Sequence, residues 1–559
     1  MLHFIKISNI IRQINKIEKG EVQMHHLKMY ELTNPQKSIW NMEKYFEGTT
    51  INNICTPAII YEKLDKEILE RAINNVIKNN DNFRIQIDLN GGIPMQYFTE
   101  YKPFKLEFIN INDKSDLKVI ESEEVSKKFE ILNSSLFRFK IAIFKDDFFA
   151  VILTVHHIIA DSWALGLVIK NILKEYHALK NNITLNEEPH SYIDYINSEE
   201  NYKKQEKYKK DKEYWQDKFK DIPESVSIPS LKKNQKNISY KAKRESFNLD
   251  ANFMQQINNF CKENRISIFN FLMAIYAIYI SRVSHTDDFV IGTPILNRTN
   301  YQEKQTMGMF VNTVPIRISN ISDLRFIDFV KSLSSTIVGV LRHQKYSYTQ
   351  ILEDLRSKNS NISSLYNILI SYQITKAFDE EYGKYKTDWV FNNYCSSDFN
   401  IHITDINDTG DLIVSYDYLI DKYNFKDIQD FHARIIYIIK QVLCTKSILV
   451  HNIEIVTENE KDAIFDIFDN TSVNYPKDKT IVDLFEDQAQ KTPDNIAIAF
   501  EDKTLTYKEL NKKANSLANF LIKKGLKKHD IIAIRIDKSI EMIVGILAII
   551  KLRRLLFTN

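Results

Sequence analysis

The sequence is poor in the residues that mark special classes of protein. Only 12 glycines and 11 prolines occur among 559 residues, which argues against low-complexity linkers, and no tandem repeat of short period is present. The four cysteines are far apart and form no CxxC pair: Cys55, Cys261, Cys395 and Cys444. This pattern fits a reducing compartment and supplies no zinc-site spacing.

An excess of charge of one sign and a long apolar run are also lacking. Lys and Arg total 75 against 73 Asp and Glu, and the basic run at residues 201–215 carries interleaved acids, which is typical of a solvated helix face. The apolar run at 542–550 is shorter than the roughly 20 residues needed to cross a bilayer. Residues 1–20 carry charges every few positions, unlike a signal peptide. We expect a cytoplasmic protein with no nucleic-acid partner and no membrane span.

The length and composition predict several globular domains. The chain exceeds what one ordinary hydrophobic core supports, and 44% hydrophobic and 26% charged residues are globular values. Helix-like and strand-like patterns occur on both sides of a Pro-, Ser- and Lys-rich stretch at residues 221–240, which predicts an α/β fold of two lobes that meet at a cleft. The predicted parts are a lead or docking segment at 1–26, a first lobe at 27–220, a second lobe at 221–456, a linker at 457–475 and the start of a further domain at 476–559.

A few segments carry the clearest secondary-structure patterns. Helices are predicted at residues 65–80 and 267–283, and strands at 146–155 and 411–420. The last part of the sequence predicts a helix, a strand hairpin and another helix, and it ends before such a domain would be complete.

One stretch, VHHIIADSW at residues 155–163, places two adjacent histidines before an aspartate. An apolar run precedes it and a helical pattern follows it, so the histidines lie at the end of a buried strand, just before a helix. Asp161 or Ser162 can cap that helix with a side-chain oxygen. Neighbouring side chains on an extended backbone point to opposite sides, so only one of His156 and His157 faces a given cleft.

Three interpretations of the histidine pair are open on the local residues. A metal site is disfavoured because no further His, Cys or carboxylate stands nearby at ligand spacing. A structural pair fits, since buried histidines are common. A general base also fits, because it needs a neutral imidazole and a neighbour that fixes its orientation. Asp161 can serve as that neighbour directly or by pairing with an arginine that holds the loop.

Here the sequence resembles the condensation domains of nonribosomal peptide synthetases. Their signature HHxxxDG is matched by HHIIADS, except that Ser162 replaces the glycine. Other family motifs occur in the expected order over about residues 27–455. They are LTNPQKSIW (32–40), NNDNFRI (79–85, a worn version of RHExLRT that keeps Arg84), YIDY (192–195), IGTPILNR (291–298), MFVNTVPIR (309–317) and HQKYSY (343–348).

The resemblance implies a chloramphenicol acetyltransferase-like fold, in which two lobes form a V-shaped pseudo-dimer with a central tunnel. It also implies an acyltransferase that joins a donor acyl thioester to the amine of an aminoacyl thioester on a carrier protein, giving an amide and a free thiol. No cofactor or metal is expected to be bound in the chain. Phosphopantetheine thioesters, on a carrier protein or as CoA, are the expected substrates.

The resemblance further implies roles for individual residues. His157 is the expected catalytic residue, which accepts a proton from the attacking nitrogen or holds that nitrogen in place. His156 is expected to pack and support the loop. Asp161 is expected to form a buried ion pair with Arg84 or Arg298, and the sequence does not choose between them. In such a pair Asp161 is structural rather than a proton carrier. Removing one partner would leave the other charge buried and would destabilise the fold.

Ser162 is a departure from the family pattern. The family glycine can provide a backbone conformation that a side chain restricts. Serine is small and caps helices well, so reduced or retained function is expected rather than none. The histidine pair itself argues against the heterocyclising subtype, which carries aspartates at that place.

The donor is left open by the sequence. Residues 32–53, LTNPQKSIWNMEKYFEGTTINN, are similar to a QKxIWxxEKxxxGT stretch of starter domains, which favours a fatty acyl-CoA donor and N-acylation in lipopeptide antibiotic biosynthesis. Alternatively, a chain-elongating domain takes its donor from an upstream carrier protein, with residues 1–26 as a docking helix. A third possibility is a catalytically silent fragment of a synthetase.

The tail resembles the opening of an adenylation domain. LTYKELN at residues 505–511 looks like the first core motif of that family. The Gly-rich segment that should follow GILAIIK (545–551) is replaced by LRRLLFTN. We therefore expect a truncated adenylation domain, from a frameshift or an interrupted gene, that cannot activate an amino acid.

Overall fold

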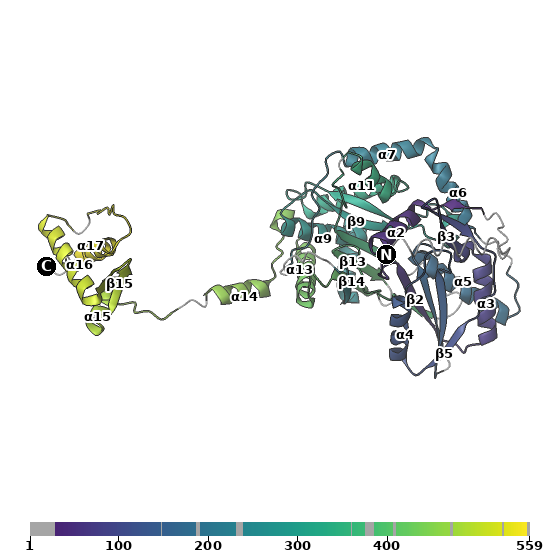
Figure 1. Cartoon of the computed structure of the whole chain (residues 1–559), viewed down its shortest axis with the longest axis horizontal. Coiled ribbons are helices and arrows are strands. Elements are labelled where there is room, and N and C mark those ends of the chain that lie inside the picture. Colours follow the sequence, from purple (N-terminus) through teal and green to yellow (C-terminus); the bar gives the residue numbers. More distant parts are fainter. Residues whose placement is uncertain are drawn as a thin grey trace, which may run out of the picture. The chain divides into compact units, whose positions relative to one another are not determined.

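The structure is a computed structural model of the chain (Figure 1). The predicted lead segment, residues 1–26, lies outside the described residues. The chain divides into two compact units, Met1–Thr457 and Glu458–Asn559. The structure describes residues 28–146, 148–185, 190–230, 239–358, 360–374, 385–405, 410–445, 447–469, 473–527 and 530–555.

The first lobe of the larger unit is built on a five-stranded sheet in the order β12-β2-β7-β6-β5. Only the β5–β6 pair is parallel. Three helices pack against the sheet: α3 (Lys66–Asn79), α4 (Lys114–Ser126) and α5 (Ser162–Lys180). The strands are β2 (Asn53–Ile60), β5 (Glu107–Ile111), β6 (Phe137–Phe144), β7 (Phe149–His156) and β12 (Tyr385–Thr387).

Strand β7 is buried along its whole length because helices cover both faces of its sheet (Figure 1). Its odd-numbered residues from Phe149 to Val155 pack in the core that includes α3 and α5. Ala150 and Ile152 pack instead with residues of α4. A strand buried on both faces has a continuous apolar sequence rather than an alternating one, which is why residues 146–155 predict it well.

The second lobe is built on a six-stranded sheet in the order β10-β9-β11-β13-β14-β8. Helix α9 is buried at every position from Asn270 to Ser281, as expected of a helix that is apolar on all sides. The helices that pack in this lobe's core include α8 (Ala251–Asn264), α9 (Ile268–Ser284), α11 (Phe326–Arg342) and α13 (Phe425–Cys444). The strands are β8 (Ala242–Leu249), β9 (Phe289–Ile295), β10 (Asn312–Ile318), β11 (Ile368–Ile374), β13 (Phe399–Asp405) and β14 (Leu412–Leu419).

The remaining elements of the larger unit are short. A three-stranded sheet has the order β1-β4-β3. The elements are β1 (Tyr30–Glu31), α2 (Asn34–Tyr45), η1 (Asp81–Arg84), β3 (Ile85–Asn90), β4 (Ile93–Phe98), α6 (Tyr192–Lys203), α7 (Glu206–Lys218), α10 (Tyr301–Gln305), α12 (Tyr348–Arg356) and η4 (Val450–Asn452).

The two lobes exchange segments, so they do not divide at a single position. Strand β12 follows most of the second lobe in the chain, yet it pairs with β2 of the first lobe. Met309 and Phe310 lie in the first lobe's core, although they also fall in the predicted second lobe. Trp215 and Phe219 precede the predicted boundary at 220/221 but pack in the core of the second lobe. The apolar side chains of Trp215, Phe219, Met309 and Phe310 are buried in the core that each segment contacts. A local sequence pattern does not predict which of the two cores that is.

The smaller unit, Glu458–Asn559, has its own hydrophobic cluster. Lys551 is only 2% exposed, and its ammonium group contacts Glu486 and Asn511. Helix α14 (Glu458–Asp469) occupies much of the predicted linker. The other elements are α15 (Ile481–Lys491), β15 (Ile496–Phe500), β16 (Lys503–Thr506), α16 (Tyr507–Lys523) and α17 (Ile540–Leu555).

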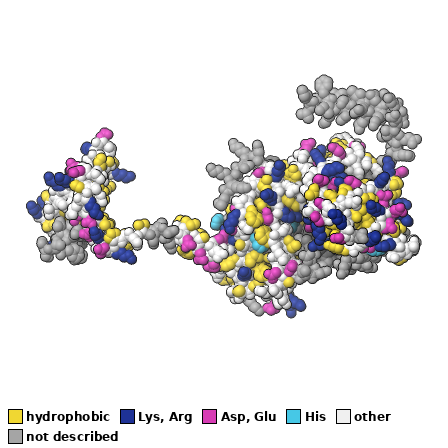
Figure 2. All heavy atoms as spheres, turned by 90° about the horizontal axis from the view of Figure 1, so that it is seen from below, with side chains coloured by type: hydrophobic (Ala, Val, Ile, Leu, Met, Phe, Trp, Pro, Cys, Tyr) yellow, Lys and Arg dark blue, Asp and Glu magenta, His cyan; other side chains and the backbone are white. Residues whose placement is uncertain are grey.

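The predicted α/β fold with two lobes is confirmed by these sheets and cores. The helices predicted at 65–80 and 267–283 are α3 and α9, and the strands predicted at 146–155 and 411–420 are β7 and β14. In Figure 2 basic and acidic side chains are interleaved on the visible face, as the near-neutral net charge predicts. Among the described residues, no single helix has the length and apolar character of a membrane span, although α8 and α9, bent by 103°, meet that test as a pair.

Gly308 provides a test of how the second lobe's segment fits onto the first lobe. Its φ is +155°, and a Cβ added there would lie 2.2 Å from the Tyr192 ring. We expect Gly308→Ala to lower the free energy of unfolding by about 1–3 kcal/mol or more, through overpacking of a buried ring and backbone strain. Urea denaturation measures the change. Gly48→Ala is the control, because Gly48 has a φ of +90° but nothing within 4 Å of the added Cβ. Equal losses in both variants would contradict the packing argument.

Candidate active site

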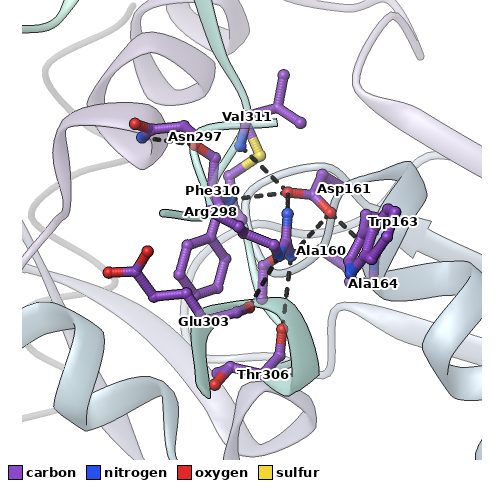
Figure 3. A network of polar contacts seen from close by, with 12 residues as sticks. Ala160, Asp161, Trp163, Ala164, Asn297, Arg298, Glu303, Thr306, Phe310 and Val311 are labelled. Carbon is purple, nitrogen blue, oxygen red and sulfur yellow. Dashed lines mark hydrogen bonds and ion pairs between the residues drawn. The ribbon is translucent and has the colours of Figure 1, made fainter. Parts of the chain in front are cut away.

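The histidine loop joins β7 to α5 in the first lobe. His156 is the last residue of β7, and Asp161 is the N-cap residue of α5, because its Oδ1 accepts a hydrogen bond from the Ala164 N–H (2.9 Å). The turn is pinned at its start as well, where the His156 N–H donates to the Leu136 carbonyl oxygen (2.8 Å). A buried strand and a capped helix thus hold both ends of the loop, and Figure 3 shows the end at Asp161.

His157 is partly exposed, and one of its ring nitrogens is fixed. Nδ1 lies 3.0 Å from the Ala160 carbonyl oxygen, which can only accept, so Nδ1 carries the proton and Nε2 keeps its lone pair. Burial lowers the pKa of His157, and the opposing effect of Asp161 does not offset it. The imidazole is therefore neutral at neutral pH and presents Nε2 as a base.

His156 has the opposite tautomer. Its Nδ1 accepts a hydrogen bond from the Ile158 N–H (3.2 Å), so its Nε2 carries the proton and lies 3.4 Å from Glu43 Oε2. The side chain is only 3% exposed. The extended backbone thus directs one histidine inward and leaves the other accessible, as the strand geometry predicts.

Asp161 is paired with Arg298, not with Arg84. Arg298 Nη1 lies 2.7 Å from Asp161 Oδ2 and Nη2 lies 3.0 Å from Oδ1, and both side chains are fully buried. The backbone N–H groups of Phe310 and Val311 also donate to Oδ2, at 2.9 and 3.1 Å (Figure 3). Burial opposes ionisation of Asp161, but Arg298 and these hydrogen bonds outweigh it and hold the pKa below its usual range.

Arg298 is itself fully engaged. Its Nε donates to the Glu303 carbonyl oxygen (3.1 Å), its Nη2 donates to the Gly308 carbonyl oxygen (3.2 Å), and its guanidinium lies 4.1 Å from the centre of the Phe310 ring. The pair therefore meets the condition under which a buried ion pair is tolerated, since the donors of one partner and the lone pairs of the other are satisfied.

The structure also places Arg84 and Ser162. Arg84 is at the end of η1, where its carbonyl oxygen accepts from the Thr99 N–H (2.9 Å) and its buried Nε has no hydrogen-bond partner among the described residues. Ser162 is the first residue of α5 and is not among the described residues with a positive φ. Serine can therefore adopt the backbone conformation that this position requires, and the helix cap is Asp161.

Several residues that hold the loop escaped the sequence analysis. Gly308 accepts from the Asp161 N–H through its carbonyl oxygen (3.3 Å), and the Asn52 carbonyl oxygen accepts from the His157 N–H (2.7 Å). Both residues act through backbone carbonyl oxygens, and because every residue has one, the residue type does not predict these contacts. Glu43 is a side-chain partner, and the only available signal was its place in the starter-like stretch at residues 32–53.

A second polar cluster crosses the sheet of the other lobe. Ser371 Oγ lies 2.7 Å from His402 Nδ1, His402 Nε2 lies 3.0 Å from Asp417 Oδ2, and Arg244 pairs with both oxygens of Asp417. The order Ser–His–Asp matches that of hydrolase triads, but Ser371 is only 1% exposed and cannot reach a substrate. The cluster ties four adjacent strands together. Among the described residues no group of three or more His, Cys, Asp or Glu side chains is arranged to hold a metal ion.

The buried ion pair gives a stability prediction. Asp161→Ala leaves the Arg298 guanidinium buried without its counter-charge, so we expect the free energy of unfolding to fall by about 3–5 kcal/mol in urea denaturation. Asp328→Ala is the control, because Asp328 pairs with Arg325 on the surface, where the side chains are 38% and 56% exposed. That exposed pair should contribute less than about 1 kcal/mol. Similar losses in the two variants would contradict the central role of the buried pair.

Comparison with known proteins gives the family. The condensation-domain family model matches residues 26–465, and the AMP-binding enzyme family model matches residues 485–556. Surfactin synthase subunit 1 of Bacillus subtilis (strain 168) is 32% identical over 531 residues, which cover 93% of this chain and 15% of the relative. A plipastatin synthase of the same organism is 30% identical over 530 residues, which cover 93% of this chain and 20% of the relative. The chain spans a fifth or less of these relatives.

Solved structures agree in fold. The condensation domain of monacolin K polyketide synthase has a TM-score of 0.67 at 18% identity, covering 76% of this chain and 99% of that one. A starter condensation domain of rhizomide synthetase, solved as a mutant with C8-CoA, has a TM-score of 0.66 at 17% identity, covering 76% and 98%. A four-domain nonribosomal peptide synthetase bound to AMP and glycine has a TM-score of 0.75 at 17% identity, covering 94% and 41%.

These findings confirm the chloramphenicol acetyltransferase-like fold class and the resemblance drawn from the motifs, whereas the predicted tunnel stays a prediction. The site residues lie where those motifs meet in space, with the family's histidine pair on one lobe and the arginine that ends IGTPILNR on the other. The match extends over most of the chain and is followed by a short AMP-binding stretch. The chain belongs to the condensation-domain family.

Proposed function

We propose that the chain is an acyltransferase of nonribosomal peptide or lipopeptide biosynthesis. It forms an amide bond between a donor acyl thioester and the amine of a carrier-bound aminoacyl thioester. One observation carries this proposal: His157 is partly exposed, and its Nδ1 lies 3.0 Å from the Ala160 carbonyl oxygen, which leaves the lone pair on Nε2. Burial, which lowers the pKa of His157, favours the neutral imidazole that a base requires. The family match and the synthetase relatives support the same chemistry.

The reaction needs one proton acceptor and no redox partner. The amine nitrogen attacks the thioester carbonyl carbon, and His157 Nε2 accepts a proton from that nitrogen or holds the nitrogen in place. The C–S bond then breaks, and the leaving thiolate takes up the proton, giving an amide and a free thiol. Base catalysis of this kind contributes about 10²- to 10⁴-fold in rate, and alignment of two bound reactants can contribute more.

The donor is proposed to be a fatty acyl-CoA. The starter-like stretch at residues 32–53 forms α2 and the turn after it, and this segment lies directly against the histidine loop, where Gln36 donates to the Ile158 carbonyl oxygen (3.1 Å). A starter condensation domain solved with C8-CoA has the same fold. The alternative is a chain-elongating domain whose donor is carried by an upstream protein. The relatives also include bacitracin synthase 2 and gramicidin S synthase 2.

The acceptor is proposed to be an aminoacyl thioester on a carrier protein. The AMP-binding match is a short stretch, and the sequence after Lys551 reads LRRLLFTN where the adenylation family has a Gly-rich segment. We infer that this unit does not itself activate an amino acid.

The proposal is tested by an amide-forming assay read by mass spectrometry. The purified chain is mixed with a panel of aminoacyl-pantetheine acceptors and with one of two kinds of donor, acyl-CoAs of several lengths or a carrier-bound peptidyl thioester. We expect an N-acyl product, and His157→Ala should lower its rate by about 10²- to 10⁴-fold. His177→Ala is the matched control, because His177 is also on this lobe but lies in α5 against Glu62, away from the histidine loop. The rate of this variant should stay at the wild-type level.

The outcomes separate the candidate functions. Product with acyl-CoA that is lost only in His157→Ala supports the starter-type reaction. Product with a carrier-bound peptidyl donor, and none with any acyl-CoA, replaces the starter type by the elongating type. No product with either donor contradicts the proposed activity and leaves the catalytically silent fragment.

A further inference from the structure

Residues near both ends of helix α2 contact the histidine loop. Near its start, Gln36 Nε2 donates to the Ile158 carbonyl oxygen. Near its end, Glu43 Oε2 lies 2.8 Å from Asn52 Nδ2 and 3.4 Å from His156 Nε2. One carboxylate oxygen of Glu43 therefore contacts both Asn52, in the turn just before β2, and His156, the first histidine of the pair.

The hydrogen bonds around His156 make Glu43 the acceptor. Since Nδ1 of His156 accepts from the Ile158 N–H, the ring proton lies on Nε2, and Nε2 is directed at Glu43. Burial works against ionisation of Glu43, but its hydrogen bonds with His156 and Asn52 hold its pKa below the usual range. An ionised carboxylate accepts hydrogen bonds and cannot donate them, so it keeps His156 in the Nε2–H tautomer.

Asn52 extends the influence of Glu43 to the second histidine. Its side-chain amide donates to Glu43, and its backbone carbonyl oxygen accepts from the His157 N–H (2.7 Å). Asn52 is only 1% exposed, so its side chain has little access to water as an alternative partner. Glu43 thus holds the ring of His156, which precedes His157 in the chain. It also holds Asn52, whose carbonyl oxygen accepts from the His157 N–H.

We propose that Glu43 is a positioning residue for His157, acting through His156 and Asn52. The kinetic consequence of this inference rests on the proposed function. Glu43 is not within hydrogen-bond distance of the His157 ring among the described contacts, so its role is to hold the loop in which Nε2 of His157 is aimed. Loss of Glu43 should therefore slow the chemical step and leave substrate binding unchanged.

Kinetics of three variants test the proposal. Glu43→Ala should lower kcat by about 10- to 100-fold with KM within about twofold, because a small displacement of the base is costly but no substrate contact is removed. Glu43→Gln keeps an oxygen acceptor and should restore kcat to within about threefold of the wild type. Glu47→Ala is the matched control, because it removes an exposed carboxylate four residues further along and should leave kcat unchanged.

A second readout does not depend on activity. ¹⁵N NMR of histidine-labelled protein reports which ring nitrogen carries the proton. In the wild type, His156 should be in the Nε2–H tautomer, and Glu43→Ala should convert part of it to the Nδ1–H tautomer, whereas Glu47→Ala should not. If Glu43→Ala does not fold, Glu43→Asp, whose carboxylate is withdrawn by one methylene, is used for both readouts.

The results decide between a positioning role and mere packing. The proposal is overturned if kcat of Glu43→Ala stays within about twofold of the wild type, if KM carries the loss, or if the His156 tautomer is unchanged. A wild type that forms no amide but shows the expected tautomer change contradicts the proposed function and supports the positioning of the loop by Glu43.

Discussion

The ion pair between Asp161 and Arg298 is the interaction on which the site depends. Two fully buried charges are stable only when every polar atom around them is satisfied, and here the carboxylate takes two guanidinium bonds and three backbone N–H bonds. Because the partners come from different lobes, the pair draws the second lobe's segment at residues 297–311 onto the first lobe. Met309 and Phe310 of that segment are then buried in the first lobe's core.

The geometry of the histidines follows from this arrangement. Asp161 caps α5, and the carbonyl group that precedes it, that of Ala160, accepts the Nδ1–H of His157. A loop that is fixed at Asp161 therefore also fixes the tautomer of His157, the base four residues before it. His156 has the opposite tautomer because its partners differ, a backbone N–H on one side and the Glu43 carboxylate on the other. The two histidine side chains are chemically identical, and their different hydrogen-bond partners give them opposite tautomers. His157 keeps a lone pair on Nε2, whereas His156 supports the loop.

Local patterns predicted the elements better than the contacts between distant segments. Strand β7 and helix α5 were readable because burial on both faces and a capped amphipathic repeat leave strong sequence signals. The choice of Arg298 over Arg84 was not readable, since it depends on how the chain returns to the first lobe 137 residues after Asp161. The pairing of β12 with β2 was missed for the same reason, and Asn52 acts through a backbone carbonyl that any residue could supply.

The central claim is that the loop presents a neutral His157 with a free Nε2. The most direct measurement is a pH titration of His157 by ¹⁵N NMR in the histidine-labelled chain, with the signal assigned by its loss in His157→Ala. Burial lowers the pKa of His157 from the ordinary value of 6.5, so the account predicts the neutral Nδ1–H tautomer at pH 7 and protonation only below pH 6.5. A protonated ring at pH 7, or the Nε2–H tautomer, would contradict the account.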